Sequence, residues 1–131
     1  MRLEGLMTPL KESSKFKELV NSLNKNNYPL NINGLSDSGK SYVISGIFDE
    51  IEESVVVVCS SEMEAKNMYE DLCLYTTNVY FFPIREVVFY NVDAISGDLR
   101  WERLKVVKEL LNSKKKILCI SANPGHPSRR L

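Results

Sequence analysis

Apolar side chains recur at spacings of three and four residues in four parts of the chain, and this period predicts helices. The predicted helices contain the stretches 8–24, 43–51, 65–72 and 98–112. The apolar stripe of the first is made of Phe16, Leu19, Val20 and Leu23. The third follows Ser61-Glu62-Met63-Glu64, a capping box that places acidic residues at the positive end of a helix. The pattern therefore predicts four helices, one of them with a defined N-terminal cap.

Four short stretches outside these helices predict strands. The stretches are residues 29–33, 54–59, 79–82 and 116–121. The run 54–59 reads Ser-Val-Val-Val-Val-Cys, which is typical of a central parallel strand that is covered on both faces. Pro83 ends the third strand. Residues 84–97 are then predicted to form a loop with one short extended piece at 87–90.

The alternation of helices and strands predicts an α/β fold with a parallel sheet and flanking helices, joined by right-handed crossovers. With 131 residues the chain is long enough for one such domain, which we predict to span residues 1–122. Residues 123–131 contain two prolines and a glycine without periodicity, and are predicted to be a disordered or vector-derived tail. The only histidine, His126, lies in this tail and is a poor candidate for catalysis.

A phosphate-binding motif lies between the first predicted strand and the second predicted helix. Residues 34–41 read Gly-Leu-Ser-Asp-Ser-Gly-Lys-Ser, which matches G-x-x-x-x-G-K-[ST] letter for letter. In such a loop the main-chain N–H groups surround the phosphates, the lysine contacts the β and γ oxygens, and the final hydroxyl binds magnesium. The fold is therefore predicted to be P-loop NTPase-like. The candidate nucleotide or phosphate ligands are Gly34, Ser36, Asp37, Ser38, Gly39, Lys40 and Ser41.

Two features argue against hydrolysis of ATP at this loop. Asp37 places a carboxylate among amides that should hold anions, and at about 4–6 Å from a triphosphate it would cost on the order of 1–4 kcal/mol. Hydrolysis also requires an acidic residue at the end of a strand to complete the magnesium shell. The last three predicted strands run into Cys59-Ser60, Phe82-Pro83 and Ser121-Ala122. We therefore predict no catalytic residue. ATP with magnesium is the candidate cofactor, and Ser41 would bind the metal only if nucleotide binds.

Composition and charge narrow the functional classes. The 17 Lys and Arg residues balance 17 Asp and Glu residues, so the chain as a whole presents no net field to nucleic acid or a membrane. The longest apolar run, 55–59, is far too short to cross a bilayer, and no membrane partner is expected. Cys59, Cys73 and Cys119 have no metal-site spacing and are predicted to be reduced core residues of a cytoplasmic protein.

The charge balance becomes basic over residues 98–116, which end in Lys114-Lys115-Lys116. Such a run is more often a solvated face than a phosphate contact, and we favour the solvated face. Trp101 in the same helix is predicted to pack the helix against the sheet rather than to stack on a base. The other basic residues of this helix are Arg100, Arg103, Lys105 and Lys108. They can pair with neighbouring acidic residues or contact DNA.

Three segments together carry a family resemblance. Residues 34–59 hold the loop, its helix and the Val-rich strand; residues 82–90 read Phe-Pro-Ile-Arg-Glu-Val-Val-Phe-Tyr; residues 101–104 read Trp-Glu-Arg-Leu at the start of a helix. The stretch from about Asn31 to Ala122 resembles the N-terminal module of the bacterial transcription-repair coupling factors (Mfd), which is similar to the first domain of the excision-repair protein UvrB. Within the F-P-x-x-E-x-x-P-Y segment of that family, the chain departs at two positions. They are Arg85, where an aromatic is common, and Phe89, where proline is common.

The resemblance implies a UvrB domain 1-like fold in a fragment of a nucleotide-excision repair protein. In that family the full-length protein recognises stalled RNA polymerase, displaces it from DNA with a separate motor domain and recruits UvrA. No contact residue for these partners can be carried over, and residues 82–90 and Arg103 are expected to have a packing role. We expect a non-catalytic docking and regulatory scaffold with a vestigial loop. The alternatives are a working P-loop ATP-binding domain of a helicase or translocase and a DNA-contacting module that uses residues 98–116.

Overall fold

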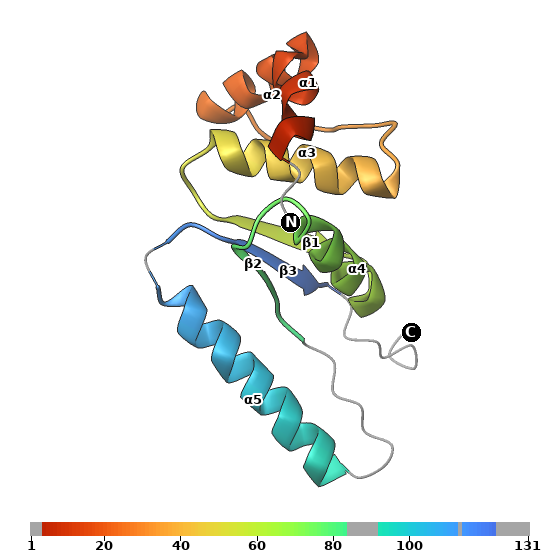
Figure 1. Cartoon of the computed structure of the whole chain (residues 1–131), viewed down its shortest axis with the longest axis vertical. Coiled ribbons are helices and arrows are strands. Elements are labelled where there is room, and N and C mark those ends of the chain that lie inside the picture. Colours follow the sequence, from red (N-terminus) through yellow and green to blue (C-terminus); the bar gives the residue numbers. More distant parts are fainter. Residues whose placement is uncertain (1–3, 84–91, 113, 123–131) are drawn as a thin grey trace.

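A computed structural model describes residues 4–83, 92–112 and 114–122 of the protein. The chain forms a small α/β fold, with a three-stranded parallel sheet and flanking helices (Figure 1). The strands are β1 (Val55–Cys59), β2 (Val79–Phe81) and β3 (Ile117–Ser121). The helices are the 3₁₀ turn η1 (Glu4–Leu6), α1 (Met7–Glu12), α2 (Ser14–Asn24), α3 (Asp37–Glu50), α4 (Glu62–Leu72) and α5 (Val92–Leu110). In Figure 1, α1 and α2 lie above α3, α3 lies above the sheet, and α5 lies below it.

The central strand of the sheet is β3, not the Val-rich strand β1. The strand order is β1-β3-β2, and both outer strands run parallel to β3, with Val55 and Val79 each opposite Ile117. The prediction that residues 54–59 form a central strand covered on both faces is therefore wrong. Val56 is 57% exposed and Val58 is 58% exposed, because β1 is an edge strand whose outward-facing side chains have no layer over them. The predicted strands 79–82 and 116–121 are confirmed, each within one residue.

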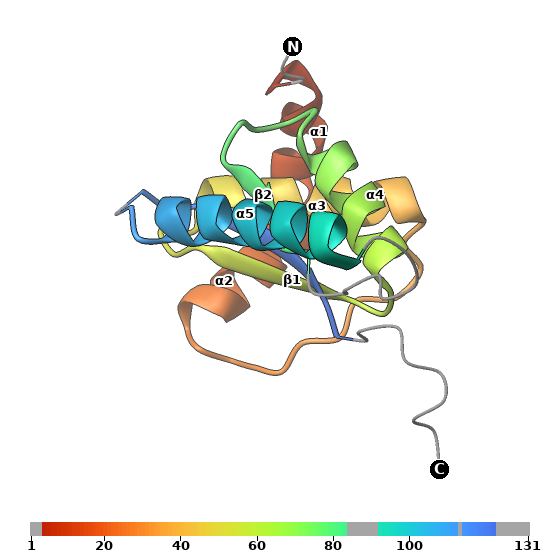
Figure 2. The ribbon, with the colours of Figure 1, turned by 90° about the horizontal axis from the view of Figure 1, so that it is seen from below.

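The first predicted strand and the single N-terminal helix are both wrong. Residues 27–33 form neither helix nor strand, and no described strand pairs with them. The N-terminal helix is divided into α1 and α2 at Ser13, whose backbone is extended with φ −66° and ψ 131°. This break lets the two segments diverge, and Figure 2 shows α1 and α2 projecting to opposite sides of α3. The apolar stripe of Phe16, Leu19, Val20 and Leu23 lies entirely after the break, within α2, so it supported only the second segment of the predicted helix.

Helix α5 is longer and less buried than expected. It begins at Val92, so the part of the predicted 84–97 loop from residue 92 onward is helical instead. The predicted extended piece at 87–90 and the predicted tail at 123–131 lie outside the described residues. Trp101, predicted to pack against the sheet, is 62% exposed, because this side of α5 has no neighbouring layer.

The main core lies between one face of the sheet and the pair α3 and α4. Side chains alternate across a strand, so every second residue of β1 and β3 points to this face. The core cluster consists of Phe48, Cys59, Ala65, Met68, Leu72, Val79, Ile117 and Cys119. The apolar face predicted for α4 is confirmed by burial of Ala65, Met68 and Leu72. Burial of these side chains positions the N-termini of α3 and α4 at the same edge of the sheet.

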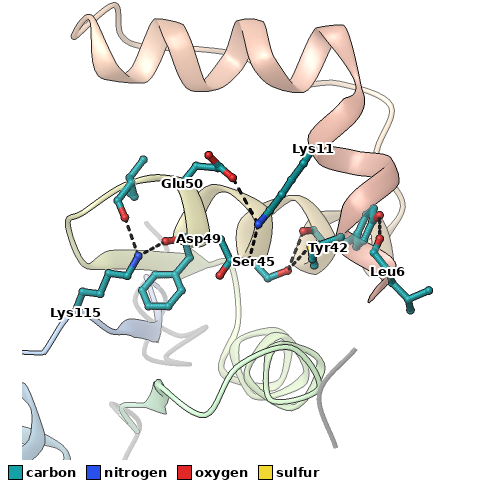
Figure 3. A network of polar contacts seen from close by, with 10 residues as sticks. Leu6, Lys11, Tyr42, Ser45, Asp49, Glu50 and Lys115 are labelled. Atoms are coloured by element: carbon teal, nitrogen blue, oxygen red, sulfur yellow. Dashed lines mark hydrogen bonds and ion pairs between the residues drawn. The ribbon is translucent and has the colours of Figure 1, made fainter. Parts of the chain in front are cut away.

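A second contact layer joins α1 to the outer side of α3. Gly46 permits the approach, since a Cβ atom there would lie 2.5 Å from Leu10 Cδ2 and 3.1 Å from Phe16 Cζ. Polar contacts surround this apolar contact (Figure 3). Lys11 lies 3.5 Å from carboxylate oxygens of both Asp49 and Glu50. Among the described elements, α1 packs mainly on α3, α2 and η1, and α3 stands between it and the sheet.

Two adjacent lysines at the start of β3 cap helices on opposite faces of the sheet. Lys115 Nζ donates to the carbonyls of Phe48 (2.6 Å) and Ile51 (2.8 Å) at the C-terminus of α3, as Figure 3 shows. Its ammonium also lies 4.5 Å from the centre of the Phe48 ring. Lys116 is 5% exposed, and its Nζ donates to the carbonyls of Glu109 (2.5 Å) and Asn112 (2.7 Å) at the C-terminus of α5. Cations are favourable at helix C-termini, where carbonyls have no intrahelical partner.

Replacing Lys115 by methionine should destabilise the fold, whereas the same change at the exposed neighbour Lys114 should not. Lys115→Met keeps the aliphatic stem but removes the donor to two carbonyls, and we expect a loss of about 1–2 kcal/mol. Lys114→Met should stay within about 0.5 kcal/mol of the parent. Urea unfolding followed by circular dichroism measures both. Equal losses of unfolding free energy in the two variants would mean that Lys114 and Lys115 act through their charge alone and not through the bonds of Lys115 to α3.

Candidate functional site

The phosphate-binding motif lies at the start of α3, at the carboxyl edge of the sheet. Gly34 has a left-handed backbone with φ +83°, and helix geometry begins at Asp37. Ser36 is the N-cap of this helix: its Oγ accepts the N–H of Gly39 at 3.1 Å, and its carbonyl accepts the N–H of Lys40 at 2.9 Å. Five of the eight motif residues, from Asp37 onward, therefore belong to the helix rather than to an open loop around a phosphate.

The hydroxyl expected to bind magnesium is turned into the protein in this arrangement. Ser41 is 2% exposed, and its Oγ donates to the carbonyl of Ser38 at 2.9 Å. This is the back-bonding geometry common for serine inside a helix. A metal would have to compete with this bond and with the surrounding packing. The residues predicted as ligands are brought together in space, but several of their polar groups already have partners within α3.

The lysine of the motif is paired with the aspartate that departs from the usual glycine. Lys40 Nζ lies 3.6 Å from Asp37 Oδ1, one turn apart on α3, with the side chains 45% and 97% exposed. An exposed pair of this kind contributes about 0–1 kcal/mol to stability. It nevertheless places a carboxylate beside the only motif cation, which weakens the attraction of this helix end for a second anion.

An acidic residue that the sequence analysis missed lies beside this edge. Acids that complete a magnesium shell are expected at strand ends, whereas Glu64 stands in the first turn of α4. Its N–H donates to the Oγ of the N-cap Ser61 at 3.1 Å. Its carboxylate reaches back to accept the N–H of Ser60 at 3.1 Å and the Ser60 hydroxyl. The capping box Ser61-Glu62-Met63-Glu64 could have located this acid from the sequence, because in such a box the glutamate side chain bends back towards the residue before the helix, here at the end of β1.

The hydrogen bonds from Ser60 lower the pKa of Glu64 below its ordinary value, with the positive charge of Lys40 a smaller favourable contribution. Partial burial opposes this shift. Lys40 and Glu64 line one groove of about 310 Å³ together with Ile32, Leu35, Val43, Ile44, Ile47, Val57, Val58, Cys59, Ser60 and Met68. Ligands in open α/β sheets bind outside the carboxyl ends of the strands, which is where this groove lies. Its walls are mostly apolar, with one cation and one anion at its rim.

Other residues considered in the sequence analysis have structural roles. Arg103 Nε donates to the carbonyl of Pro83 at 2.6 Å, and its guanidinium lies 6.0 Å from the centre of the Phe82 ring. This agrees with the packing role expected for Arg103. Cys59 and Cys119 are buried as predicted, but Cys73 is exposed, since it follows the C-terminus of α4. Within the described ranges, no cluster of three or more His, Cys, Asp or Glu side chains is placed to hold a metal ion.

The fold and its carboxyl-edge site define a small α/β protein with a phosphate-loop motif folded into a helix N-terminus. No family profile and no solved structure matches the chain. The chain is 26% identical over 118 residues to the transcription-repair-coupling factor of Bacillus subtilis (strain 168). The match covers 88% of this chain but only 10% of that protein. The similarity supports a relation to the transcription-repair coupling factors, as the motifs of the chain indicated. Among the described residues, the longest helices are too polar or too short to span a membrane.

Thiol labelling should distinguish the three cysteines. Burial, with smaller effects from Cys59 and Cys73, raises the pKa of Cys119 to about 12, and burial also raises the pKa of Cys59. Because Cys73 is exposed whereas Cys59 and Cys119 are buried, Cys73 should react first with iodoacetamide at pH 8, and Cys119 should react only on unfolding. Peptide mass spectrometry identifies the labelled residue. Fast labelling of Cys119 in the folded protein would contradict the burial of β3.

The same shift predicts a loss of stability in alkali. The Cys119 pKa is raised by folding from its ordinary value of 9.0, so burial of the neutral thiol stabilises the fold fully below pH 9. This contribution should fall as the pH rises from 9 towards about 12. Cys119→Ala should flatten the pH dependence of the urea midpoint in this window, whereas Cys73→Ala should leave it unchanged. Identical pH profiles for the two variants would exclude the buried thiol as the cause.

Proposed function

We propose that this chain is the N-terminal module of a transcription-repair coupling factor, where it acts as a non-catalytic docking and regulatory scaffold in nucleotide-excision repair. Two independent observations support this proposal. The chain is similar over 88% of its length to a part of such a factor. The phosphate-binding motif is drawn into the first turn of α3 and its lysine is paired with Asp37. The second observation carries the non-catalytic part of the proposal.

A nucleotide would have to undo several contacts to occupy this loop. The Gly39 N–H and the Ser41 hydroxyl are bonded within α3, and the Lys40 ammonium faces the Asp37 carboxylate. Each is a group that a phosphate or its magnesium would need. The nearby Glu64 carboxylate holds the N–H of Ser60, so it caps β1 and α4 rather than facing a metal. The loop is best understood as a vestigial site whose residues now stabilise a helix end.

In this proposal the activities of the longer protein belong to its other parts. The relative is ten times longer than the matched region, since the match covers 10% of it. Recognition of RNA polymerase, translocation on DNA and recruitment of UvrA would be carried by those other parts, with this module packed against them. Such a protein acts in the cytoplasm. The module would contribute surface and stability, not turnover of ATP.

The second candidate is a working P-loop ATP-binding domain. The observation that favours it is the position of Lys40, half exposed on the rim of the groove at the carboxyl edge of the sheet. Helix N-termini attract anions through their free N–H groups and their dipole. If the first turn of α3 opened, Lys40 and the N–H groups of residues 34–39 would be available to a phosphate.

Calorimetry and an ATPase assay on the purified chain separate these candidates. We expect no hydrolysis of Mg-ATP above the buffer rate and binding no tighter than millimolar. Asp37→Gly removes the carboxylate beside the lysine, and if any nucleotide enters the loop its affinity should rise roughly tenfold, which corresponds to about 1.4 kcal/mol. Hydrolysis that is abolished by Lys40→Ala and retained in Lys114→Ala would overturn the non-catalytic assignment.

A further inference from the structure

We propose that the outer face of α5 is a docking surface for an acidic amphipathic helix of a partner protein. The apolar part of this surface, the α5 stripe, consists of Trp101, Leu104, Val107 and Leu111. Three exposed cations flank the stripe. The inference goes beyond the scaffold role proposed above and does not depend on it, because it uses only the exposed side of one helix.

Contacts on the opposite side of α5 determine which of its faces points outward. Arg103 Nε donates to the carbonyl of Pro83 at 2.6 Å. The Tyr80 hydroxyl donates to Glu109 Oε2 at 3.4 Å, and Lys116 Nζ donates to carbonyls at the C-terminus of α5. These bonds hold the side of α5 that carries Arg103 and Glu109 towards the sheet. Figure 2, seen from below, shows α5 in front of the sheet with no described element covering it, so the α5 stripe faces solvent.

The α5 stripe is a continuous apolar patch rather than a set of scattered side chains. Leu104 is 59% exposed and Leu111 is 83% exposed, and Trp101 and Val107 are exposed beside them. The N–H of Leu111 donates to the carbonyl of Val107 at 3.1 Å, so Leu111 continues the last turn of the helix. Successive members are three or four residues apart, which makes them neighbours on one helix face. Single exposed apolar residues are normal on a surface, whereas a contiguous patch marks an interaction site.

The charges beside the α5 stripe decide what kind of partner it fits. Arg100, Lys105 and Lys108 are exposed, and each is four residues from a member of the stripe and therefore lies beside it. None of the three forms an ion pair with a residue that the structure describes. Paired helices select one another by an apolar stripe with opposite charges along its flanks. The complementary surface is therefore an apolar helix face that is flanked by Glu or Asp.

The same charges argue against three other occupants of this surface. Two copies of the chain that met symmetrically on the α5 stripe would bring the cations of one copy towards those of the other. A nucleic acid would contact the cations but leave the aliphatic members of the stripe uncovered. Helices that lie on membranes have a polar face rich in Lys and Arg, whereas the side of α5 away from the stripe carries Glu102 and Glu109. An acidic amphipathic helix satisfies both the apolar and the charged parts of the surface.

Fluorescence of Trp101 tests the proposal directly, because this residue is the only tryptophan of the chain. The probe is a synthetic helical peptide of about five turns that carries leucine at i, i+3, i+4 and i+7 on one face and glutamate on both flanks of that face. Its addition to the purified chain should shift the Trp101 emission to shorter wavelength until the signal saturates. A control peptide with lysine in place of every glutamate should bind at least about tenfold more weakly.

Two matched pairs of variants test the apolar and the charged parts of the surface separately, and all of them retain Trp101. Leu104→Ser should weaken binding of the acidic peptide at least about fivefold, whereas Leu74→Ser, at a leucine that is 50% exposed after α4, should not. Lys108→Gln should weaken binding about two- to fivefold, whereas Lys17→Gln on α2 should leave it unchanged. All four positions are exposed, so the urea midpoint of each variant should equal that of the parent.

Four results would overturn the proposal. They are the absence of a shift with the acidic peptide, equal affinity for the acidic and the lysine peptide, unchanged affinity in Leu104→Ser, and a shift that requires no peptide. A shift on concentrating the chain alone would assign the α5 stripe to a second copy. A shift with vesicles of phosphatidylserine and phosphatidylcholine, but not with the peptide, would assign it to a membrane. The samples contain neither nucleotide nor repair proteins, so failure here leaves the scaffold role to its own test.

Discussion

The structure depends on the central position of β3 and on the two lysines that precede it. Strand β3 is the only described strand with a neighbour on both sides, and Ile117 and Cys119 are completely buried beneath α4. Lys115 and Lys116 stand at its start and point to opposite faces, where they bind the last carbonyls of α3 and α5. Adjacent residues of an extended chain alternate in direction, so one dipeptide holds a helix on each side of the sheet.

The two faces of the sheet differ strongly in how well they are covered. The face under α3 and α4 carries the apolar core, whereas Val56 and Val58 on the opposite face are more than half exposed. Helix α5 contacts this side of the sheet through Lys116, through the hydroxyl of Tyr80, which donates to Glu109 Oε2 at 3.4 Å, and through Arg103, which donates to the carbonyl of Pro83. Large exposed apolar patches generally mark interaction surfaces. The exposed face therefore suits a module that packs within a larger protein.

The phosphate-binding motif has a different meaning in the fold from the one its letters suggest. A motif of this type needs an open loop, a free lysine and a presented hydroxyl. Here Ser36 caps α3, Lys40 neighbours Asp37, and Ser41 is buried against its own helix. Each departure follows from one cause, which is that helical geometry begins three residues before the lysine. The motif residues contribute to the N-terminus of α3 whether or not an anion ever binds there.

Local pattern predicted those parts of the protein whose cause is local. The capping box before α4, the apolar stripe of α4, and the strands β2 and β3 were all predictable, because propensity and period act over a few residues. The motif at residues 34–41 is equally local, and in the fold its Asp37 lies beside Lys40. The family resemblance was also readable in the chain, and it agrees with the sequence similarity to a transcription-repair-coupling factor.

Tertiary structure alone decided which strand is central, where Lys115 and Lys116 point, and that Glu64 lies near Lys40. All three features depend on which segments meet in the folded protein. Two strands of equal apolar content give no local indication of which one is central in the sheet and which one is at its edge. The break at Ser13 and the exposure of Trp101 have the same origin, since both follow from which neighbouring layer is available. The sequence by itself determined the elements and their chemistry. Packing determined their partners, because burial is a property of the assembled layers and not of any single stretch of chain.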